Sequence, residues 1–443
     1  LPSNGHLLEE ITDKGEVGTV VLDDISKDSL YDDGIDTFIT GQYPNNYIWY
    51  SGKLWRAVSV NNNEKTVKLV TQWNISAIPY NQENNTAFEG SYIEDWLNDT
   101  TVDGFLGNLR DYERFIKLDS KWNATMMSDT SKPQSTAIVE DPVGLINIYE
   151  YTMSYTDANY SKGYLNNGLL WWTLTPYDEA TTYNISNSGE LGTYSPAGAI
   201  GIRPSINLKN DIKIISGSGT ENDPYRLNGD NDTNLNGTYL KDRYSGEYLI
   251  FGTGENNLYR IVSHENGTGT KITSAEPLKE NGTSKNLTFG NSISFSPEST
   301  VGNFLNIEYL SNIYLTDNQL NMIEKNNTFY LGTVGYGRSY KLSKYTNVTD
   351  NLLTSNIVTT QVGLLRLGEL MAGQFNSGNK NSSYWTLTPY NTELMRNINR
   401  NSNVDSSNIN SISGIKPTLN LKGNVVITSG DGTKNNPFVL ILE

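Results

Sequence analysis

The sequence predicts a strand-rich α+β fold made of two tandem homologous domains. The segment Trp172–Tyr177 returns as Trp385–Tyr390, 213 positions later (385 − 172). The same spacing relates Gly217–Tyr225 to Gly430–Phe438, so it holds from position 172 to position 225. A constant spacing over such a length is typical of duplicated domains. Each copy also opens and closes with short runs of alternating apolar residues, which are typical of strands, and helical patterns are few.

The repeat extends upstream with a drifting spacing. Tyr47 and Tyr50 align with Tyr248 and Phe251, 201 positions later (248 − 47). Insertions that change the spacing belong in surface loops, where a longer loop costs little to close. We therefore expect one repeat domain at 33–229 and a second at 234–443, each of ordinary domain size. Residues 1–32 have no counterpart and form an N-terminal extension.

The first strands and the first helix follow from local patterns. Residues 47–50 and 54–60 alternate large apolar side chains around Gly52, which predicts a hairpin. Ser91 followed by Glu94 predicts a capping box at the start of a helix. The second repeat keeps Ser299 but has Gly302 in the place of Glu94, so its helix start is expected to be weaker. The further strands that we expect lie at 66–70, 172–176, 206–208, 212–215 and 438–442.

Composition indicates an extracellular bacterial protein. The 443 residues include no Cys, which excludes disulfides, thiolate metal sites and Cys nucleophiles. A secreted eukaryotic protein of this size usually carries disulfides, so a bacterial cell surface is the better prediction. The net charge of −16 argues against nucleic acid as a partner. No apolar run approaches the ~18 residues of a membrane span, so we expect no membrane insertion of this chain.

Three motifs together resemble a known group of domains. Tyr47–Arg56, Trp172–Pro176 and Gly201–Tyr225 resemble a domain common in surface and secreted proteins of low-GC Gram-positive bacteria. The resemblance covers nearly all of the chain after residue 33, although Tyr259 and Lys416 depart from it. It implies a place on the bacterial surface. The closing motif is also similar to the end of the formylglycine-generating-enzyme-like branch of the C-type lectin fold. That similarity implies a C-type-lectin-like domain whose loops bind ligands, without the oxidase activity, because the required Cys pair is absent.

The sequence offers little for catalysis, and we expect no enzyme. The only histidines are His6 and His264, and neither recurs in the other repeat, which excludes a His-based site in both domains. Glu150 and Glu369 are the only acid kept in both repeats within a recognisable motif, and we interpret them as structural or solvated. A glycosidase with paired carboxylates stays open as an alternative, because two acids can come from anywhere in a fold.

Some duplicated residues are expected to be structural. Trp172 and Trp385 lie in alternating strands beside Leu, so burial in the core is favoured over a role as sugar-stacking platforms. Arg203 and Lys416 each precede a Pro, and pairing with a buried acid is the simplest interpretation of both.

Candidate ligand contacts follow the strand-ending prolines. Tyr177 and Asp178 in the first repeat match Tyr390 and Asn391 in the second. An aromatic ring beside a hydrogen-bonding side chain suits contacts with sugars or peptides. We predict these four residues as the ligand-binding loops.

The segment between the repeats resembles a calcium loop. Asp230, Asp232 and Asn234 space their oxygens as such a loop does. Leu235 stands where an EF-hand requires Gly, and no Glu follows at the twelfth position. A polar linker and a bound calcium ion that stiffens the linker are the two interpretations.

Two functions are consistent with these patterns. The first is adhesin-like recognition of a glycan or protein on a host or neighbouring cell, because two weak sites on one chain gain avidity. The alternative is a self-associating subunit of a surface filament or layer. Residues 17–22 are strand-like, so they suit addition to the sheet edge of a neighbouring subunit. Otherwise these residues pack on their own first domain.

Overall fold

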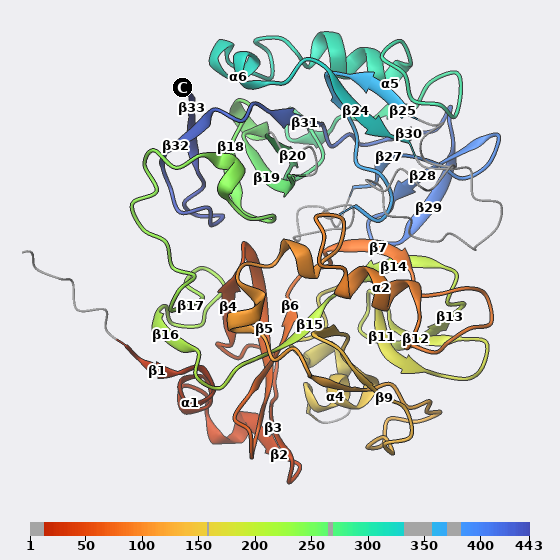
Figure 1. Cartoon of the computed structure of the whole chain (residues 1–443). Coiled ribbons are helices and arrows are strands. Elements are labelled where there is room, and N and C mark those ends of the chain that lie inside the picture. Colours follow the sequence, from red (N-terminus) through yellow and green to blue (C-terminus); the bar gives the residue numbers. More distant parts are fainter. Residues whose placement is uncertain (1–12, 157–158, 265–268, 332–356, 370–381) are drawn as a thin grey trace, which may run out of the picture.

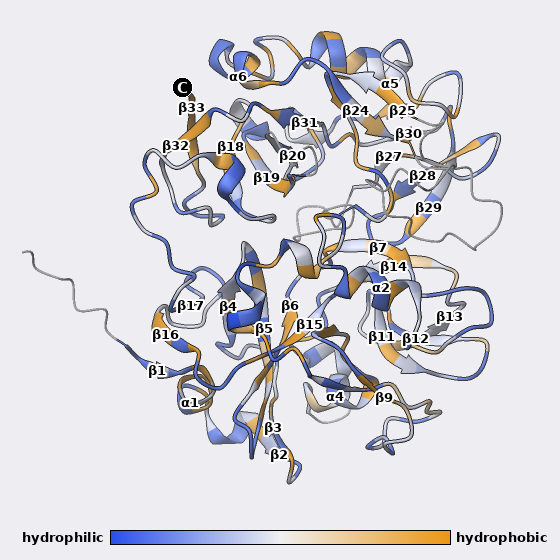
Figure 2. Cartoon of the chain, viewed as in Figure 1, coloured by the Kyte–Doolittle hydropathy of each residue, from blue (hydrophilic) through white to orange (hydrophobic). Residues whose placement is uncertain are grey.

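The computed structural model describes most of the chain and confirms a strand-rich α+β fold, in which residues in strands greatly outnumber residues in helices. Figure 1 shows the first half of the chain below the second half. Hydrophobic residues concentrate on strands such as β6 and β14, and the connecting loops are mostly hydrophilic (Figure 2). The described residues are 13–156, 159–264, 269–331, 357–369 and 382–443.

The main sheet of the first half has the order β16-β17-β4-β5-β6-β15-β10, with β1 beside β16 and β3 beside β5. The hairpin predicted around Gly52 is confirmed as β4 and β5, in which Tyr47 pairs with Arg56. β17 runs parallel to β4, and Tyr225 pairs with Ile48. The strands are β1 (Gly15–Glu16), β2 (Leu30–Asp32), β3 (Asp36–Ile39), β4 (Tyr47–Tyr50), β5 (Lys53–Asn61), β6 (Val67–Thr71), β10 (Val143–Gly144), β15 (Ser205–Leu208), β16 (Lys213–Ser216) and β17 (Tyr225–Leu227).

The second half repeats this strand arrangement. β18-β19-β20-β31-β26 form one sheet, and β33 pairs with β32. A parallel bridge from Leu249 to Phe438 joins the two groups, as Ile48 and Tyr225 do in the first half. In the ladders, Lys68 pairs with Asn207 and its counterpart Lys271 pairs with Asn420. The strands are β18 (Tyr248–Ile250), β19 (Leu258–Ser263), β20 (Thr270–Ser274), β26 (Val362–Gly363), β31 (Thr418–Leu421), β32 (Val425–Ser429) and β33 (Val439–Leu442).

A second sheet in each half contains the Trp-Thr-Leu-Thr-Pro motif. In the first half the order is β13-β12-β11-β14-β7, and in the second it is β27-β28-β29. Both motif strands have an irregular register between the Trp and the Pro, at Trp172/Pro176 and Trp385/Pro389. The strands are β7 (Ser76–Pro79), β11 (Trp171–Pro176), β12 (Thr182–Ile185), β13 (Leu191–Tyr194), β14 (Ala199–Ile202), β27 (Tyr384–Pro389), β28 (Leu394–Ile398) and β29 (Val404–Asn408).

Short helices cover the sheets and begin at polar caps. Ser91 Oγ accepts the Glu94 amide at 3.1 Å as predicted, but the Glu94 carboxylate accepts from the Gly90 amide, so the predicted reciprocal box is wrong. In the second half Ser299 caps a shorter helix that continues as a π-helix, Phe304–Glu308. The helices are α1 (Val17–Asp23), α2 (Tyr92–Asn98), α3 (Tyr112–Phe115), α4 (Ile148–Met153), α5 (Thr300–Asn303) and α6 (Asp317–Met322).

Smaller elements complete the described chain. The short strands are β8 (Lys121–Asn123), β9 (Ile138–Glu140), β21 (Lys279–Glu280), β22 (Thr283–Ser284), β23 (Leu287–Thr288), β24 (Asn327–Tyr330), β25 (Ile357–Thr360) and β30 (Ile412–Ser413). The 3₁₀ turns are Lys27–Ser29, Leu106–Asn108, Tyr160–Lys162, Leu240–Asp242 and Gly254–Asn256.

The N-terminal extension packs on the first half, and the strand expected at 17–22 is wrong. These residues form α1, because Val17, Val20 and Val21 have helical spacing and all three are buried in the first core. Ahead of the helix, β1 pairs with β16. Near the start of the second half, the Gly237 amide donates to the carbonyl of Ile427 in the equivalent strand β32. β16 and its equivalent β32 therefore each have a hydrogen-bonded partner on the side away from β17 and β33. Residues 1–12 lie outside the described residues.

Each half has its own hydrophobic core. One cluster consists of residues between Val17 and Leu227, together with Val262 and Leu365. The other lies between Leu240 and Phe438. The duplicated tryptophans are core residues, as expected: Trp172 is 0% exposed and Trp385 is 1% exposed. Their indole N–H groups donate to the carbonyls of Ile78 and Leu287.

The duplicated acid is structural, as expected. Glu150 accepts the amide of Asn147 in a capping box and pairs with Lys68. Glu369 accepts the amide of Arg366 and pairs with Lys271 at 2.7 Å. The Glu150 pair connects α4 to β6, and the Glu369 pair connects the turn after β26 to β20, the equivalent strand of the second half.

Arg203, the cation that precedes Pro in the first repeat, does not form the expected ion pair with a buried acid in the described part of the chain. Arg203 donates to the carbonyls of Thr71 and Leu165 and stacks on the Trp171 ring at 4.6 Å. Among the described residues no acid pairs with it, so the expected ion pair is wrong for Arg203. Lys416 keeps the stacking, with its Nζ 5.0 Å from the centre of the Tyr384 ring.

Candidate binding cleft between the repeats

Equivalent loops of the two repeats meet each other. Asn435 Nδ2 donates to the carbonyl of Asn222 at 3.4 Å, and the two residues are 213 positions apart, which is the spacing of the duplication. Contact between the same surfaces of two copies is typical of two-fold association. Gly217–Tyr225 and Gly430–Phe438, which contain these residues, are called the paired turns below.

A buried lysine fixes the contact between the halves. Lys53 follows the Ser51–Gly52 turn of the first hairpin, and its Nζ donates to the carbonyls of Ser51 and Ser245 and to Ser245 Oγ at 2.9–3.0 Å. Complete burial lowers the pKa of Lys53 to about 7. Gly52 has a φ of +74°, and a Cβ there would lie 2.6 Å from the Ser245 carbonyl. The close approach of the two halves therefore requires glycine at this position.

The predicted calcium loop takes part in an arginine network. Arg110 contacts Asp230 at 3.3 Å and Asp232 at 3.1 Å, and Arg243 contacts Asp232 at 2.7 Å. Burial raises the pKa of Asp230 to about 7. Partial burial acts to raise the pKa of Asp232 too, but hydrogen bonds from both arginines lower it overall. Asn234 adopts a left-handed φ of 57°.

This network gives the linker carboxylates cationic partners of their own. Within the described parts of the chain, no group of three or more His, Cys, Asp and Glu residues is arranged to hold a metal ion. The arrangement favours the polar-linker interpretation, and calcium at Asp230, Asp232 and Asn234 stays a prediction.

Beside the paired turns lies a cavity of about 390 Å³, which we call the inter-repeat cleft. Its apolar wall includes Trp49, Trp73 and Tyr248. Trp49 and Tyr248 pack together with Ala275 in a small cluster that joins the two halves. Trp73 is partly exposed, so one indole is available to a molecule in the cleft.

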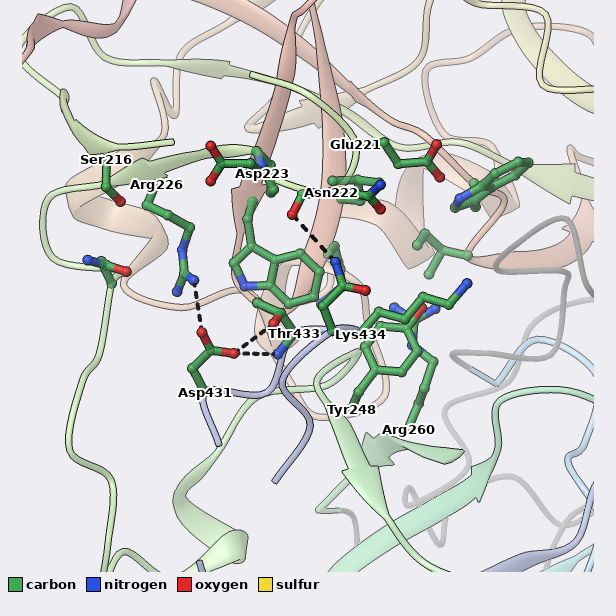
Figure 3. A pocket seen from close by; sticks show the side chains of 18 residues that line it. Ser216, Glu221, Asn222, Asp223, Arg226, Tyr248, Arg260, Asp431, Thr433 and Lys434 are labelled. Carbon is green, nitrogen blue, oxygen red and sulfur yellow. Dashed lines mark hydrogen bonds and ion pairs between the residues drawn. The ribbon is translucent and has the colours of Figure 1, made fainter. Parts of the chain in front are cut away.

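The polar wall comes from the paired turns (Figure 3). Glu221 and Asp223 lie on the side of the first repeat, and Asp431, Thr433 and Lys434 come from the second. Since Glu221 and Lys434 occupy equivalent positions of the duplication, the two sides of the cleft carry opposite charges at matched places. Asn222 and Asn435 add amide groups.

Part of this wall is fixed internally and part is available. Asp431 Oδ1 accepts the amide and hydroxyl of Thr433 at 3.0 and 2.7 Å, and its Oδ2 lies 3.7 Å from Arg226. In contrast, Glu221, Asp223 and Lys434 are exposed. Their side chains form no hydrogen bond or ion pair with other residues in the described ranges. They can therefore bind a ligand without breaking an internal contact.

The predicted ligand residues of the first repeat lie elsewhere. Tyr177 is 38% exposed and packs edge-on against Tyr183, with ring centres 5.1 Å apart. Asp178 Oδ1 accepts the amides of Ala180 and Thr181 at 2.8 and 2.7 Å. The amide of Ala180 and the other hydrogen bonds to this carboxylate lower the pKa of Asp178. The side chain thus stabilises the turn between β11 and β12.

In the second repeat, Asn391 stabilises the equivalent turn as Asp178 does in the first. Asn391 Oδ1 accepts the amides of Glu393 and Leu394, both at 2.8 Å. Tyr390 lies under Arg396 and lines a second cavity of about 190 Å³. Tyr177 does not line that cavity. The structure thus gives Asp178 and Asn391 a role in turns and does not bring the two tyrosines into one site; ligand binding by these four residues stays a prediction.

The sequence interpretation missed the cleft. It used the paired turns as evidence for the duplication but assigned no role to their side chains. The available signal was the run Glu221-Asn222-Asp223, three polar residues beyond a glycine turn and next to a Pro. Trp73 gave no signal, because it lies outside the duplicated motifs.

Comparisons with known proteins identify no relative. No protein-family model, no curated protein and no solved structure matches the chain. In the described segments, no helix combines the length and the apolar character needed to cross a membrane.

Proposed function

We propose that this chain is an extracellular bacterial surface protein whose two tandem homologous domains bind a ligand on a host or neighbouring cell. The ligand is a glycan or a protein, the site is the inter-repeat cleft, and the role is adhesin-like recognition without catalysis. The matching strand order and the paired turns support the two-domain proposal. The surface location and the C-type-lectin-like character rest on sequence resemblance.

The observation that carries this proposal is the composition of the cleft. Small-molecule sites are concave, mostly apolar and contain a few convergent polar groups. Here Trp49, Trp73 and Tyr248 supply the apolar wall. Glu221 and Lys434 supply charged groups that bind nothing else in the described chain. The lining includes no His or Cys, and its amides and carboxylates are suited to hydrogen bonding of a ligand.

The test is binding of the purified, fluorescently labelled chain to a panel of host and bacterial cells. The double variant Glu221→Ala/Lys434→Ala alters the cleft, and Tyr177→Ala/Tyr390→Ala alters the loops predicted from sequence. We expect the first variant to lose binding and the second to keep it. The opposite result would assign binding to the loops, and a wild-type chain that labels no cell would refute the surface-binding role.

The filament subunit remains the second proposal for the same surface location. It requires an N-terminal segment that is free to pair with another copy. Residues 15–23 are instead paired and packed within the first half, so they would have to leave it in order to pair with another copy. Electron microscopy of the concentrated chain tests this, since isolated particles at high concentration would refute self-assembly.

A further inference from the structure

We infer that the inter-repeat cleft recognises a neutral glycan, taken up as a terminal mono- or disaccharide against the face of Trp73. This inference rests on the proposed function and specifies its ligand. It follows from the position of Trp73, from the charge of the walls and from the pairing of the nearby strands.

Trp73 is a partly open aromatic surface on a well-anchored stretch of chain. It follows β6, and both of its neighbours in sequence are hydrogen-bonded. The Gln72 amide donates to the carbonyl of Leu54 at 2.8 Å, and Asn74 Nδ2 donates to the carbonyl of Leu170 at 2.9 Å. The Trp73 indole N–H has no partner among the described residues. An indole in this position offers a flat apolar face to sugar C–H groups and a donor to a hydroxyl.

The charged groups that line the cleft together with Trp73 are close to balance. Glu221 and Asp223 carry negative charges, and Lys434 and Arg260 carry positive charges. Arg226 and Asp431 lie 3.7 Å apart, and Lys53, whose pKa burial lowers to about 7, adds at most one positive charge. A cleft of balanced charge within a protein of net charge −16 is poorly suited to sulfated or sialylated glycans, which need an excess of cations. Carboxylates, amides and an ammonium in alternation are suited to the many hydroxyls of a neutral sugar, each of which donates and accepts.

The strands beside the cleft leave no open edge for an added strand. Strand addition to an open sheet edge is one recurring mode of peptide recognition. β4 is already paired on both sides, by β17 and β5. β18 is likewise paired by β19 and by Phe438, whose amide donates to the Tyr248 carbonyl at 3.0 Å. Neither strand can therefore pair with a peptide, and the side chains of the cleft are the groups that face a ligand.

The size of the cleft limits the ligand. Its volume of about 390 Å³ lies at the lower end of the range of about 300–1,000 Å³ found for small-molecule sites. This leaves room for the end of a glycan and not for a long internal stretch. Recognition of the non-reducing end is the expected mode.

The experiment uses the full chain with an array of neutral, sialylated and sulfated glycans, followed by calorimetric titration of the strongest hit. We expect neutral glycans to bind and Trp73→Ala to weaken the titrated affinity more than about ten-fold through lost stacking and area. Trp73→Phe, which keeps an aromatic face, should recover most of the affinity. Tyr43→Ala is the matched control, since Tyr43 is an exposed aromatic residue outside the cleft. Thermal unfolding of each variant checks that it folds.

Four outcomes overturn the inference. Binding restricted to sialylated or sulfated glycans refutes the neutral ligand, and equal affinity of Trp73→Ala and wild type refutes the site. Cell binding that survives periodate oxidation of surface glycans but not protease treatment refutes a glycan ligand, while the proposed surface-binding function stands. Failure to bind both cells and array refutes the proposed function together with the inference.

Discussion

Replacing Lys53 with Met is expected to remove a pH-dependent contribution to stability at the contact between the repeats. Burial lowers the pKa of Lys53 from 10.5 to about 7 in the folded chain. The unfolded chain keeps a pKa near the ordinary value of about 10.4. Between pH 7 and about 10 the unfolded state therefore binds a proton that the folded state does not. Stability must rise with pH across this window, because the cost of burying a charged amine disappears.

The magnitude follows from the same two pKa values. From pH 7 to pH 9 the amine in the unfolded chain is almost fully protonated. The buried amine passes from half protonated to nearly neutral over the same range. With about 1.4 kcal/mol per pKa unit, the difference makes the folded chain roughly 2 kcal/mol more stable at pH 9 than at pH 7 through Lys53 alone.

Guanidinium unfolding followed by tryptophan fluorescence at pH 7, 8 and 9 measures this effect. Other titrating groups, such as Lys416 with its own pKa lowered to about 7 by burial, cancel when Lys53→Met is compared with wild type. The exposed Lys162, changed to Met, controls for loss of a lysine from the surface. A free-energy difference between wild type and Lys53→Met that stays constant with pH would refute the reasoning. It would mean that Glu247 and Asp230 keep the amine charged.

Three other perturbations test the structural assignments. Glu369→Gln leaves its buried lysine partner without a carboxylate and should cost about 3–5 kcal/mol in urea unfolding; Glu150→Gln should cost less, because its lysine partner is 17% exposed. Trp172→Ala should lower the free energy of unfolding by about 3–5 kcal/mol, whereas the exposed Tyr177→Ala should stay within about 1 kcal/mol in the same assay. Calcium or chelator should leave the melting temperature unchanged, because two arginines already hold Asp232; a calcium-dependent rise would restore the calcium linker.

Local patterns predicted the elements that depend on local contacts. The hairpin around Gly52 and the closing strands follow from alternation over four to eight residues, and the structure confirms them. The pattern at 17–22 is compatible with both a strand and a helix, since Val17, Val20 and Val21 also share one face of a helix. Packing of these side chains on the first core selects the helix, and no local pattern contains that information.

Contacts between distant residues explain what the sequence did not predict at the site. Asp230 and Asp232 have spacing like that of calcium ligands, but Arg110 lies 120 residues before Asp230 and no motif announces it. The inter-repeat cleft exists only because turns 213 residues apart come together. In the sequence these turns are two separate segments with nothing to show that they meet. The sequence therefore predicts the duplication but not the cleft that the two copies form together.

If the inter-repeat cleft is the binding site, the two copies form one composite site, and this changes what the repeat implies for binding. Two independent sites would give avidity and a stoichiometry of two ligands per chain. In the cleft, however, the paired turns face the same space, and Glu221 on one side opposes Lys434 on the other. Each copy of the turn keeps its glycines and its Pro, which preserve the backbone, while the exposed Glu221 and Asp223 of the first copy are replaced by Lys434 and Asn436 in the second. Calorimetric titration should therefore find one ligand per chain; two would return the binding role to the separate loops at Tyr177 and Tyr390.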